Sequence, residues 1–278
     1  MKLVTSIGAV RAARADFQSL GLVPTMGYLH EGHASLIERA KRECGAVAVS
    51  IFVNPTQFGP NEDLSRYPRD LERDFALLRD AAADLVFVPE VEEIYPKGFA
   101  SSIDVGPVAN VLEGASRPGH FAGVATVVAK LFNIVQPTRA YFGQKDAQQC
   151  VVIKHMVRDL DLPVEIVIAP TVRGPDGLAV SSRNSYLTPA EHDAATVLYR
   201  ALTAARNAFA AGERSATVLR TMVKDMVATE PMVRLDYVSV ANPDTLAEWD
   251  LAGPGALMSL AAFVGKTRLI DNVSLGGG

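Results

Sequence analysis

The sequence predicts an α/β fold in which a parallel sheet is covered by helices, followed by a smaller C-terminal α+β domain. Apolar runs alternate with longer amphipathic stretches up to residue 170, which is the pattern of a parallel sheet wrapped by helices. Near residue 172 this pattern gives way to a long polar loop, two helical stretches and three strand-like runs. We therefore expect two domains, 1–171 and 172–278.

In the first domain, apolar runs bounded by Gly, Pro or Asn predict buried strands, and apolar residues at three- and four-residue spacing predict helices. The predicted strands are 21–25, 46–53, 83–89 and 164–170, and segment 141–149 has a strand-like entry. The predicted helices are 34–44, 69–82 and 124–135. Ligands of parallel sheets bind at the carboxyl ends of strands, so the loops after these runs are the first places to look for a site.

The second domain opens with a polar loop over 173–189. The alanine-rich run 190–212 predicts one helix and the run 215–229 predicts another. The last three apolar runs, 234–242, 256–265 and 267–275, predict strands. Helices followed by strands indicate a smaller α+β domain.

Composition narrows the class of protein. A chain of 278 residues with 49% hydrophobic residues can build one or two cores, and its formal charge of -4 lacks the basic excess of a nucleic-acid-binding protein. The N-terminus has no long apolar centre of a signal peptide, and the run 46–53 is far too short to span a bilayer. We expect a cytoplasmic protein without nucleic-acid or membrane partners.

The segment MGYLHEGH, 26–33, places two of the five histidines in the turn between a predicted strand and a predicted helix. Amides at a helix N-terminus attract anions, and imidazoles there can donate hydrogen bonds to charge that develops on a phosphate. His30 and His33 are three residues apart, so both rings can point into one pocket if the first helical turn starts near His30. The spacing differs from the HExxH zinc signature, and a metal site or simple turn capping are the alternatives.

Two further segments place polar side chains after strand-like runs. Asn54 and Gln57 carry neutral amides that suit the orientation of hydroxyl and carboxylate groups, although Asn-Pro also starts ordinary turns. Lys145 and Asp146 stand side by side, where the lysine suits a phosphate and the aspartate suits ribose hydroxyls or a magnesium ion. An exposed salt-bridged loop is the alternative for this pair.

The polar loop itself contains AVSSRNS, 179–185, whose hydroxyls and guanidinium can clamp an oxyanion, unless it is a mobile serine-rich linker. Arg117 and His120 precede the helix 124–135 and are also explained by a glycine turn at the helix entry. A histidine pair after the first strand and a Ser-Ser-Arg loop after the last follow the order of the HIGH-type and KMSKS-type elements of adenylate-forming nucleotidylyl transferases.

The sequence resembles the pantothenate synthetase (pantoate–β-alanine ligase) family over nearly its whole length. The resemblance rests on VPTMGYLHEGHASLI, SIFVNPTQFGPNEDLSRYPRDLE, RPGHFAGVATVV, YFGQKDAQQ, SSRNSYL and the near-terminal TRLIDN, in that order. It implies a Rossmann-like domain that carries the site, a smaller C-terminal domain that acts as a lid, and a homodimer. It also implies a two-step reaction: ATP and (R)-pantoate form pantoyl adenylate and pyrophosphate with Mg2+, and β-alanine then gives pantothenate and AMP.

The resemblance also implies roles for individual residues, and it leaves the magnesium ligands unknown. The expected catalytic residues are His30, His33, Asn54 and Lys145. Gln57 and Gln149 would bind pantoate, and Gln57 would also bind β-alanine. The expected ATP-binding residues are Met26, Gly27, Tyr28, Leu29, His30, Glu31, Gly32, His33, Gly143, Gln144, Lys145, Asp146, Val172, Val180, Ser181, Ser182 and Arg183.

Three residues depart from the family's common pattern. Tyr28 stands where alanine is common, and Thr56 and Val180 each stand where methionine is common. We expect these changes to affect substrate affinity and pocket shape rather than the reaction.

Three other functions fit parts of the pattern. They are a nucleotidylyl transferase acting on a phosphate ester, a non-catalytic nucleotide sensor and a metal-dependent hydrolase using HEGH. A phosphorylated acceptor would require more basic residues than the neutral amides of NPTQF and DAQQ provide.

Overall fold

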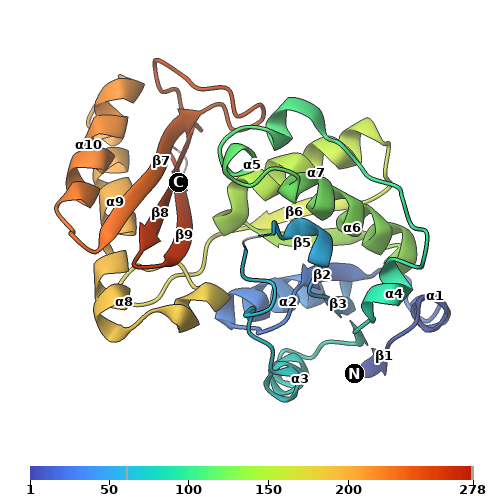
Figure 1. Ribbon diagram of the computed structural model, residues 1–278. Helices are drawn as coiled ribbons and strands as arrows, with labels where there is room; N and C mark the ends of the chain where they lie inside the picture. Colours follow the sequence, from blue (N-terminus) through green and yellow to red (C-terminus); the bar gives the residue numbers. More distant parts are fainter. Residues whose placement is uncertain (61, 277–278) are drawn as a thin grey trace. The chain divides into compact units, whose positions relative to one another are not determined.

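The computed structural model describes residues 1–60 and 62–276, and the chain divides into two compact units (Figure 1). The first unit comprises Met1–Gly143 and Gln148–Pro170. The second comprises Thr171–Gly278 together with the short segment Gln144–Ala147, a grouping that no sequence pattern indicates. The last two residues of the predicted domain 172–278 lie outside the described part of the chain.

The first unit contains a six-stranded parallel sheet with the strand order β1-β4-β3-β2-β5-β6. The strands are β1 (Lys2–Val4), β2 (Gly21–Thr25), β3 (Val47–Ile51), β4 (Leu85–Phe87), β5 (Arg139–Gly143) and β6 (Glu165–Ala169). The predicted α/β class is confirmed, and the four predicted strands correspond to β2, β3, β4 and β6. The sequence pattern missed β1, because three residues are too few to show an alternation of apolar and polar positions.

Helices cover both faces of this sheet. They are α1 (Ile7–Arg14), α2 (Glu31–Cys44), α3 (Leu71–Asp80), α4 (Val91–Ile94), α5 (Glu113–Ser116), α6 (His120–Val135) and α7 (Ala147–Asp159), with short 3-10 turns η1 (Pro55–Gln57), η2 (Gly106–Ala109) and η3 (Gln144–Asp146). Figure 1 shows α2 and α3 on one face of the sheet and α6 and α7 on the other. Ile37 of α2 and Leu78 of α3 are fully buried against the sheet residues Val49 and Val86. Among the described residues, the helices are too short or too polar for any of them to cross a membrane.

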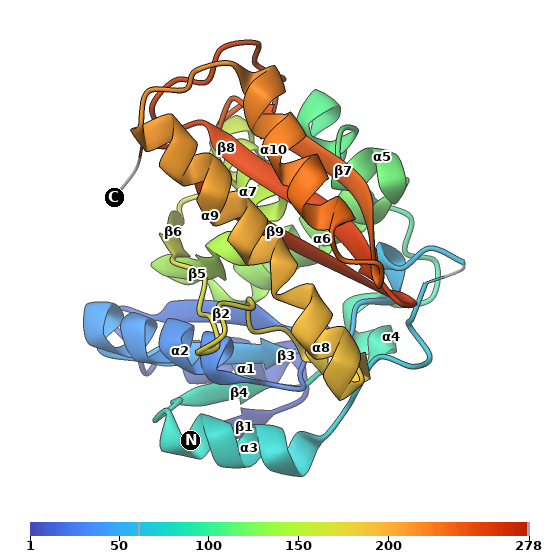
Figure 2. The same cartoon turned by 90° about the vertical axis from the view of Figure 1, so that its left-hand side faces the viewer.

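The second unit contains an antiparallel sheet with the strand order β7-β8-β9, formed by β7 (Val233–Ala241), β8 (Leu257–Val264) and β9 (Thr267–Ser274). Its helical elements are η4 (Ser182–Tyr186), α8 (Pro189–Ala195), α9 (Val197–Ala210) and α10 (Ala216–Ala228). Figure 2 shows α9 and α10 across one face of the sheet, where Leu202 and Val223 join a fully apolar core with Leu260. This architecture confirms the predicted α+β class of the C-terminal part.

One predicted helix of the second unit is wrong in its extent. The run 190–212 forms two helices, α8 and α9, which meet at Thr196. The Thr196 hydroxyl donates a 2.7 Å hydrogen bond to the Asp193 carbonyl, and its amide donates to the same oxygen at 3.2 Å. This local bonding competes with the regular helical ladder and ends α8 there.

Candidate active site

The sheet of the first unit has one point at which the direction of its winding reverses. From β2 the chain proceeds through α2 to β3 on one side, whereas β5, which pairs with β2 on its other side, leads to β6. In open parallel sheets, ligands bind beyond the carboxyl ends of the strands at such a switch point. The predicted nucleotide-binding residues 26–33 follow β2 directly, and Gly143 ends β5.

The two histidines lie side by side at the start of α2. His30 precedes the helix with an extended backbone, and His33 lies in the first turn, so their ring centroids are 4.1 Å apart. The His30 amide donates to Nδ1 of His33 at 3.3 Å. When the His33 ring is neutral, its proton is therefore on Nε2, which can donate to an anion. Both rings thus lie at the N-terminus of α2, where the backbone amides also favour negative charge.

A buried carboxylate that the sequence analysis missed holds the turn between β2 and α2. Asp74 of α3 is 1% exposed, and its two carboxylate oxygens accept hydrogen bonds from the amides of Tyr28 at 2.9 Å and Leu29 at 2.6 Å. Burial raises the pKa of Asp74, while the two amide hydrogen bonds oppose that shift. Asp74 shares the helix face of Leu78, so an acidic residue on an apolar face was the available signal.

The same turn depends on its backbone conformation. Gly27 has a φ of 82°, and a Cβ atom there would lie 3.0 Å from both Asp74 Oδ2 and Ile51 Cγ2. Tyr28, the first departure from the family pattern, has a φ of 51°, and the guanidinium of Arg73 lies 4.7 Å from its ring centroid. The turn is therefore held by α3 as well as by its own sequence.

We expect Asp74→Ala to lower the free energy of unfolding by roughly 2–4 kcal/mol, because it leaves two backbone amides without their charged acceptor. Urea denaturation at pH 7 measures the change. Asp80→Ala, at an exposed position of the same helix, is the matched control and should stay within about 0.5 kcal/mol of wild type. A stability of Asp74→Ala equal to that of the control would contradict the role of Asp74.

The turn after β3 orients the predicted pantoate-binding residue Gln57. Asn54 is 1% exposed, and its Nδ2 donates to Gln57 Oε1 and to the Gly123 carbonyl, both at 3.2 Å. Its Oδ1 accepts from the hydroxyls of Tyr95 at 2.8 Å and Thr56 at 2.9 Å, so the Thr56 departure adds a hydrogen bond here. These contacts leave Nε2 of Gln57 directed toward the Met26 sulfur, 3.1 Å away.

Asn54 is one of the four expected catalytic residues. This geometry supports a role for it in orienting Gln57. The Nδ2 and Oδ1 atoms of its side-chain amide both form hydrogen bonds within the protein. These bonds fix which end of the Gln57 amide is the donor. Gln57 can then present an N–H group to a carboxylate or hydroxyl.

The pair Arg117 and His120, at the entry of α6, contacts the same turn. His120 begins α6, and its Nδ1 donates to the Gln57 carbonyl at 2.8 Å, while Nη1 of Arg117 donates to its Nε2 at 3.1 Å. Arg117 in turn is paired with Glu62, Nε to Oε1, at 2.8 Å. One turn into the helix, a Cβ atom on Gly123 would overlap the Thr56 carbonyl. The start of α6 therefore braces the Gln57 backbone.

The environment of His120 predicts a pH dependence. Burial first, and then the positive charge of Arg117, lower the pKa of His120 to about 4. A folded pKa below the unfolded one means that the unfolded chain binds more protons as the pH falls, so stability is lost below about pH 6.5. For this group alone the loss between pH 7 and pH 5 is roughly 2 kcal/mol.

The variant His120→Asn keeps a donor near the Nδ1 position and cannot titrate. Denaturation at pH 7 and pH 5 should show a pH dependence that is smaller by roughly 2 kcal/mol than in wild type. An unchanged difference between the two pH values would show that His120 does not titrate as this geometry requires.

The remaining predicted site residues are distributed over both units. In the first unit, Gln149 of α7 is half-buried, whereas its neighbour Gln148 is buried and donates to the carbonyls of Val108 at 2.9 Å and Val111 at 2.8 Å. Gln148 is thus a structural residue of α7, and the pantoate contact expected of Gln149 stays a prediction.

In the second unit, Lys145 Nζ lies 3.5 Å from Asp146 Oδ1 within η3. Val180 donates its amide to the Val172 carbonyl at 3.0 Å, which closes the loop before Ser181. Ser181 then caps η4, and its Oγ accepts from the Arg183 amide at 3.3 Å. Local hydrogen bonds therefore hold the predicted residues 26–33, Asn54 and Gln57 of the first unit and the loop 172–183 of the second.

The described residues offer no dedicated metal cage. In 1–60 and 62–276 there is no group of three or more His, Cys, Asp or Glu side chains arranged to hold a metal ion. Glu31 and Asp146 are the carboxylates among the predicted ATP-binding residues. Mg2+ at phosphate sites is usually held by one or two carboxylates together with substrate phosphates and water, and this donor set is compatible with that arrangement.

Comparison with known proteins identifies a single family. The family described as Pantoate-beta-alanine ligase matches residues 2–274. The pantothenate synthetase of Chloroflexus aggregans is 63% identical over 98% of this chain and 99% of its own length. That of Moorella thermoacetica is 56% identical over 99% of both chains.

Solved structures agree in fold over the whole chain. The crystal structure of pantothenate synthetase from Thermus thermophilus superposes with a TM-score of 0.96 at 51% identity and covers 100% of both chains. The pantoate-beta-alanine ligase of Francisella tularensis, crystallised with beta-gamma ATP and beta-alanine, gives a TM-score of 0.82 at 37% identity, covering 100% of this chain and 99% of the other.

Proposed function

We propose a division of chemistry among individual residues from one premise: this chain belongs to the pantoate-beta-alanine ligase family. The chain is an enzyme that forms pantothenate from pantoate, β-alanine and ATP. The observation that best supports the proposal is the adjacent pair of imidazoles at the N-terminus of α2, beyond the switch point of the parallel sheet.

In the first step, a pantoate carboxylate oxygen attacks the α-phosphorus of ATP. The bond from that phosphorus to the oxygen bridging to the β-phosphate breaks, and pyrophosphate leaves with the electron pair. Because two anions meet, the barrier is largely electrostatic and positional. We assign His30, His33 and Lys145 to the charge on the α- and β-phosphates, and Ser181, Ser182 and Arg183 to the departing pyrophosphate.

We assign the orientation of pantoate to the amide side chains. Gln57 donates from Nε2 to pantoate, in the orientation that Asn54 supports, and Gln149 is its second pantoate contact. The other predicted nucleotide contacts are Met26 to Leu29, Glu31, Gly32, Gly143, Gln144, Asp146, Val172 and Val180. Asp146 or Glu31 would hold Mg2+, which would neutralise part of the charge of the ATP phosphates.

In the second step, the free amine of β-alanine attacks the acyl carbon of pantoyl adenylate. The carbon–oxygen bond to the phosphate breaks, AMP leaves, and the nitrogen loses a proton as the amide forms. Gln57 is the residue assigned to β-alanine. No covalent enzyme intermediate is required, in keeping with the positions of Cys44 and Cys150 outside the predicted site residues.

Product analysis with purified protein tests the proposal. Exchange of labelled pyrophosphate into ATP should require pantoate but not β-alanine, and AMP release at the full rate should require both. ATP binding without turnover would indicate a nucleotide sensor. AMP transfer to a phosphate ester, or hydrolysis that a chelator of zinc abolishes, would favour the other two alternatives.

We further propose that ATP binding orders the loop 173–185 further, beyond the contacts that Arg173 and Val180 already make, as expected of a lid segment. Limited proteolysis should then show at least about a threefold slower cleavage in this loop with ATP than without it. The loop between β8 and β9 is the internal control, since its cleavage should not change. Equal cleavage with and without ATP would count against a lid. The homodimer and the cytoplasmic location expected from the sequence stay predictions.

A further inference from the structure

The near-terminal block TRLIDN has no part in the roles proposed above, although it ends in two buried polar residues. Asp271 and Asn272 of β9 are 3% and 4% exposed. Side chains alternate between the two faces of a strand. Asp271 shares the face of Leu269 and Val273, which pack in the core with α9 and α10, so Asn272 lies on the opposite face.

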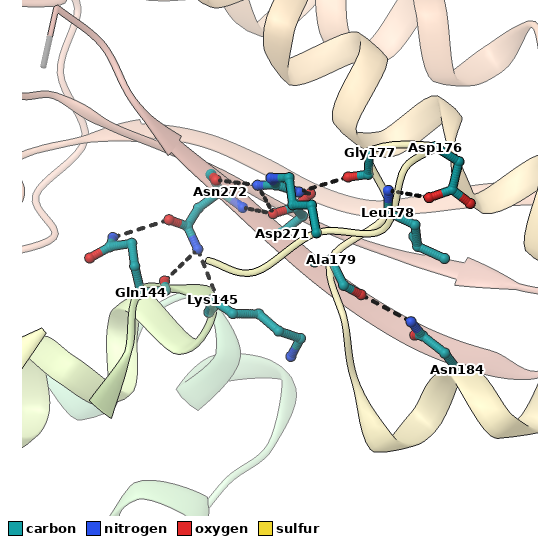
Figure 3. Close-up of polar contacts among 10 residues, drawn as sticks. Gln144, Lys145, Asp176, Gly177, Leu178, Ala179, Asn184, Asp271 and Asn272 are labelled. Carbon is teal, nitrogen blue, oxygen red and sulfur yellow. Dashed lines mark hydrogen bonds and ion pairs between the residues drawn. The ribbon is translucent and has the colours of Figure 1, made fainter. Parts of the chain in front are cut away.

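Asp271 holds the loop that leads to Ser181–Arg183. Its carboxylate accepts two hydrogen bonds from Arg173, at 2.7 Å from Nη1 and 2.8 Å from Nη2 (Figure 3). The guanidinium also donates to the carbonyls of Gly177 at 3.2 Å and Asn272 at 3.3 Å. A bidentate pair of this kind fixes orientation as well as distance. Arg173 therefore ties both ends of its own turn to β9.

Asn272 holds the other phosphate-binding segment of this unit. Its Nδ2 donates to the carbonyls of Gln144 at 2.9 Å and Lys145 at 3.0 Å, and its Oδ1 accepts from Nε2 of Gln144 at 3.1 Å. Figure 3 shows the Lys145 side chain extending away from Asn272. The contact therefore fixes the Lys145 backbone and leaves the ammonium group for a ligand. It also explains why the segment Gln144–Ala147 groups with the C-terminal part of the chain.

We propose that Asp271 and Asn272 are positioning residues that hold Lys145 and the Ser181–Arg183 segment in a fixed relation, so that both act on ATP as one body. This inference rests on the proposed roles of those residues. Two adjacent strand residues, one on each face, connect segments that are more than thirty positions apart in sequence (145 and 181). A site supported by a strand is held more precisely than one on loops alone, and a displacement of about 1 Å can cost about a hundredfold in rate.

The test is a double-mutant comparison. Asn272→Ala should lower kcat for pantoate-dependent pyrophosphate exchange by about tenfold or more, with little change in KM for pantoate. In a Lys145→Ala background the same replacement should cost less than about threefold, because it acts through Lys145. Asp236→Ala removes an ion pair with Arg268, 2.8 Å, from the same sheet and is the matched control, which should keep near-wild-type exchange.

A second measurement does not depend on activity. Hydrogen exchange should be faster over 144–147 in Asn272→Ala and over 173–180 in Asp271→Asn, and unchanged there in Asp236→Ala. The inference would be overturned if Asn272→Ala lowered pyrophosphate exchange equally in the wild-type and the Lys145→Ala backgrounds. It would also be overturned if hydrogen exchange were unaltered in both Asn272→Ala and Asp271→Asn. Absence of pantoate-dependent pyrophosphate exchange in wild type would instead overturn the proposed function, and hydrogen exchange would still decide the inference.

Discussion

His33→Ala is expected to lower the rate of pantoyl adenylate formation by at least about a hundredfold while the protein stays folded. The ring lies in the first turn of α2, 4.1 Å from that of His30, and its Nδ1 accepts from the His30 amide. The neutral ring is therefore fixed with its donor at Nε2. One preorganised donor aimed at developing charge is worth about 3–4 kcal/mol at the transition state.

Two conservative variants separate the functions of the two ring nitrogens. His33→Asn supplies an acceptor near the Nδ1 position and should keep the contact with the His30 amide. His33→Gln supplies a donor near the Nε2 position and should recover part of the activity. We expect His33→Asn to keep more of the wild-type stability, as measured by urea denaturation. We expect His33→Gln to keep more of the turnover, as measured by pyrophosphate exchange.

His155→Ala on α7 is the matched control and should exchange pyrophosphate within about twofold of wild type. Near-normal exchange by folded His33→Ala would remove His33 from the catalytic group. Equal losses in the asparagine and glutamine variants would show that the two ring nitrogens are not separable in this way.

The sheet was predictable because its central strands are buried on both faces. Such strands leave continuous apolar runs, as in AVAVSIFV at 46–53, and the amphipathic helices between them keep their three- and four-residue spacing. The adjacency of His30 and His33 was also expected from their spacing of three residues, although His30 lies just before α2 with an extended backbone and its amide donates to His33 Nδ1. Apolar runs and helical spacing therefore predicted those features that depend on residues close together in the sequence.

The supports of the site were not predictable, because they come from residues far apart in sequence. Asp74 holds amides 45 and 46 positions away, and His120 holds the carbonyl of Gln57 across 63 positions. Asn272 reaches Lys145 across 127 positions. In each case the sequence shows only a polar residue on a buried element, and the fold alone determines which backbone group that residue satisfies.

Lys145→Ala is the second replacement with a large expected effect, again at least about a hundredfold in the adenylation step. Its backbone is held by Asn272, and its ammonium forms a 3.5 Å ion pair with Asp146, whose side chain is about half exposed. Lys145→Met removes the charge and keeps most of the side-chain volume, so it should lose about as much as alanine. Lys145→Arg should recover only part, because a planar fork does not replace a compact ammonium.

The two steps of the reaction allow the effect of Lys145→Ala to be measured separately in each. Charge moves onto the β-phosphate only in the first step, when pyrophosphate departs, whereas the second step releases AMP. Single-turnover measurements should therefore show a larger loss in pantoyl adenylate formation than in its conversion to pantothenate by β-alanine. Lys154→Ala, exposed on α7, is the matched control and should leave both steps within about twofold of wild type. Equal losses in the two steps would place Lys145 on the α-phosphate alone, and near-normal adenylation by Lys145→Met would exclude a charge-stabilising role.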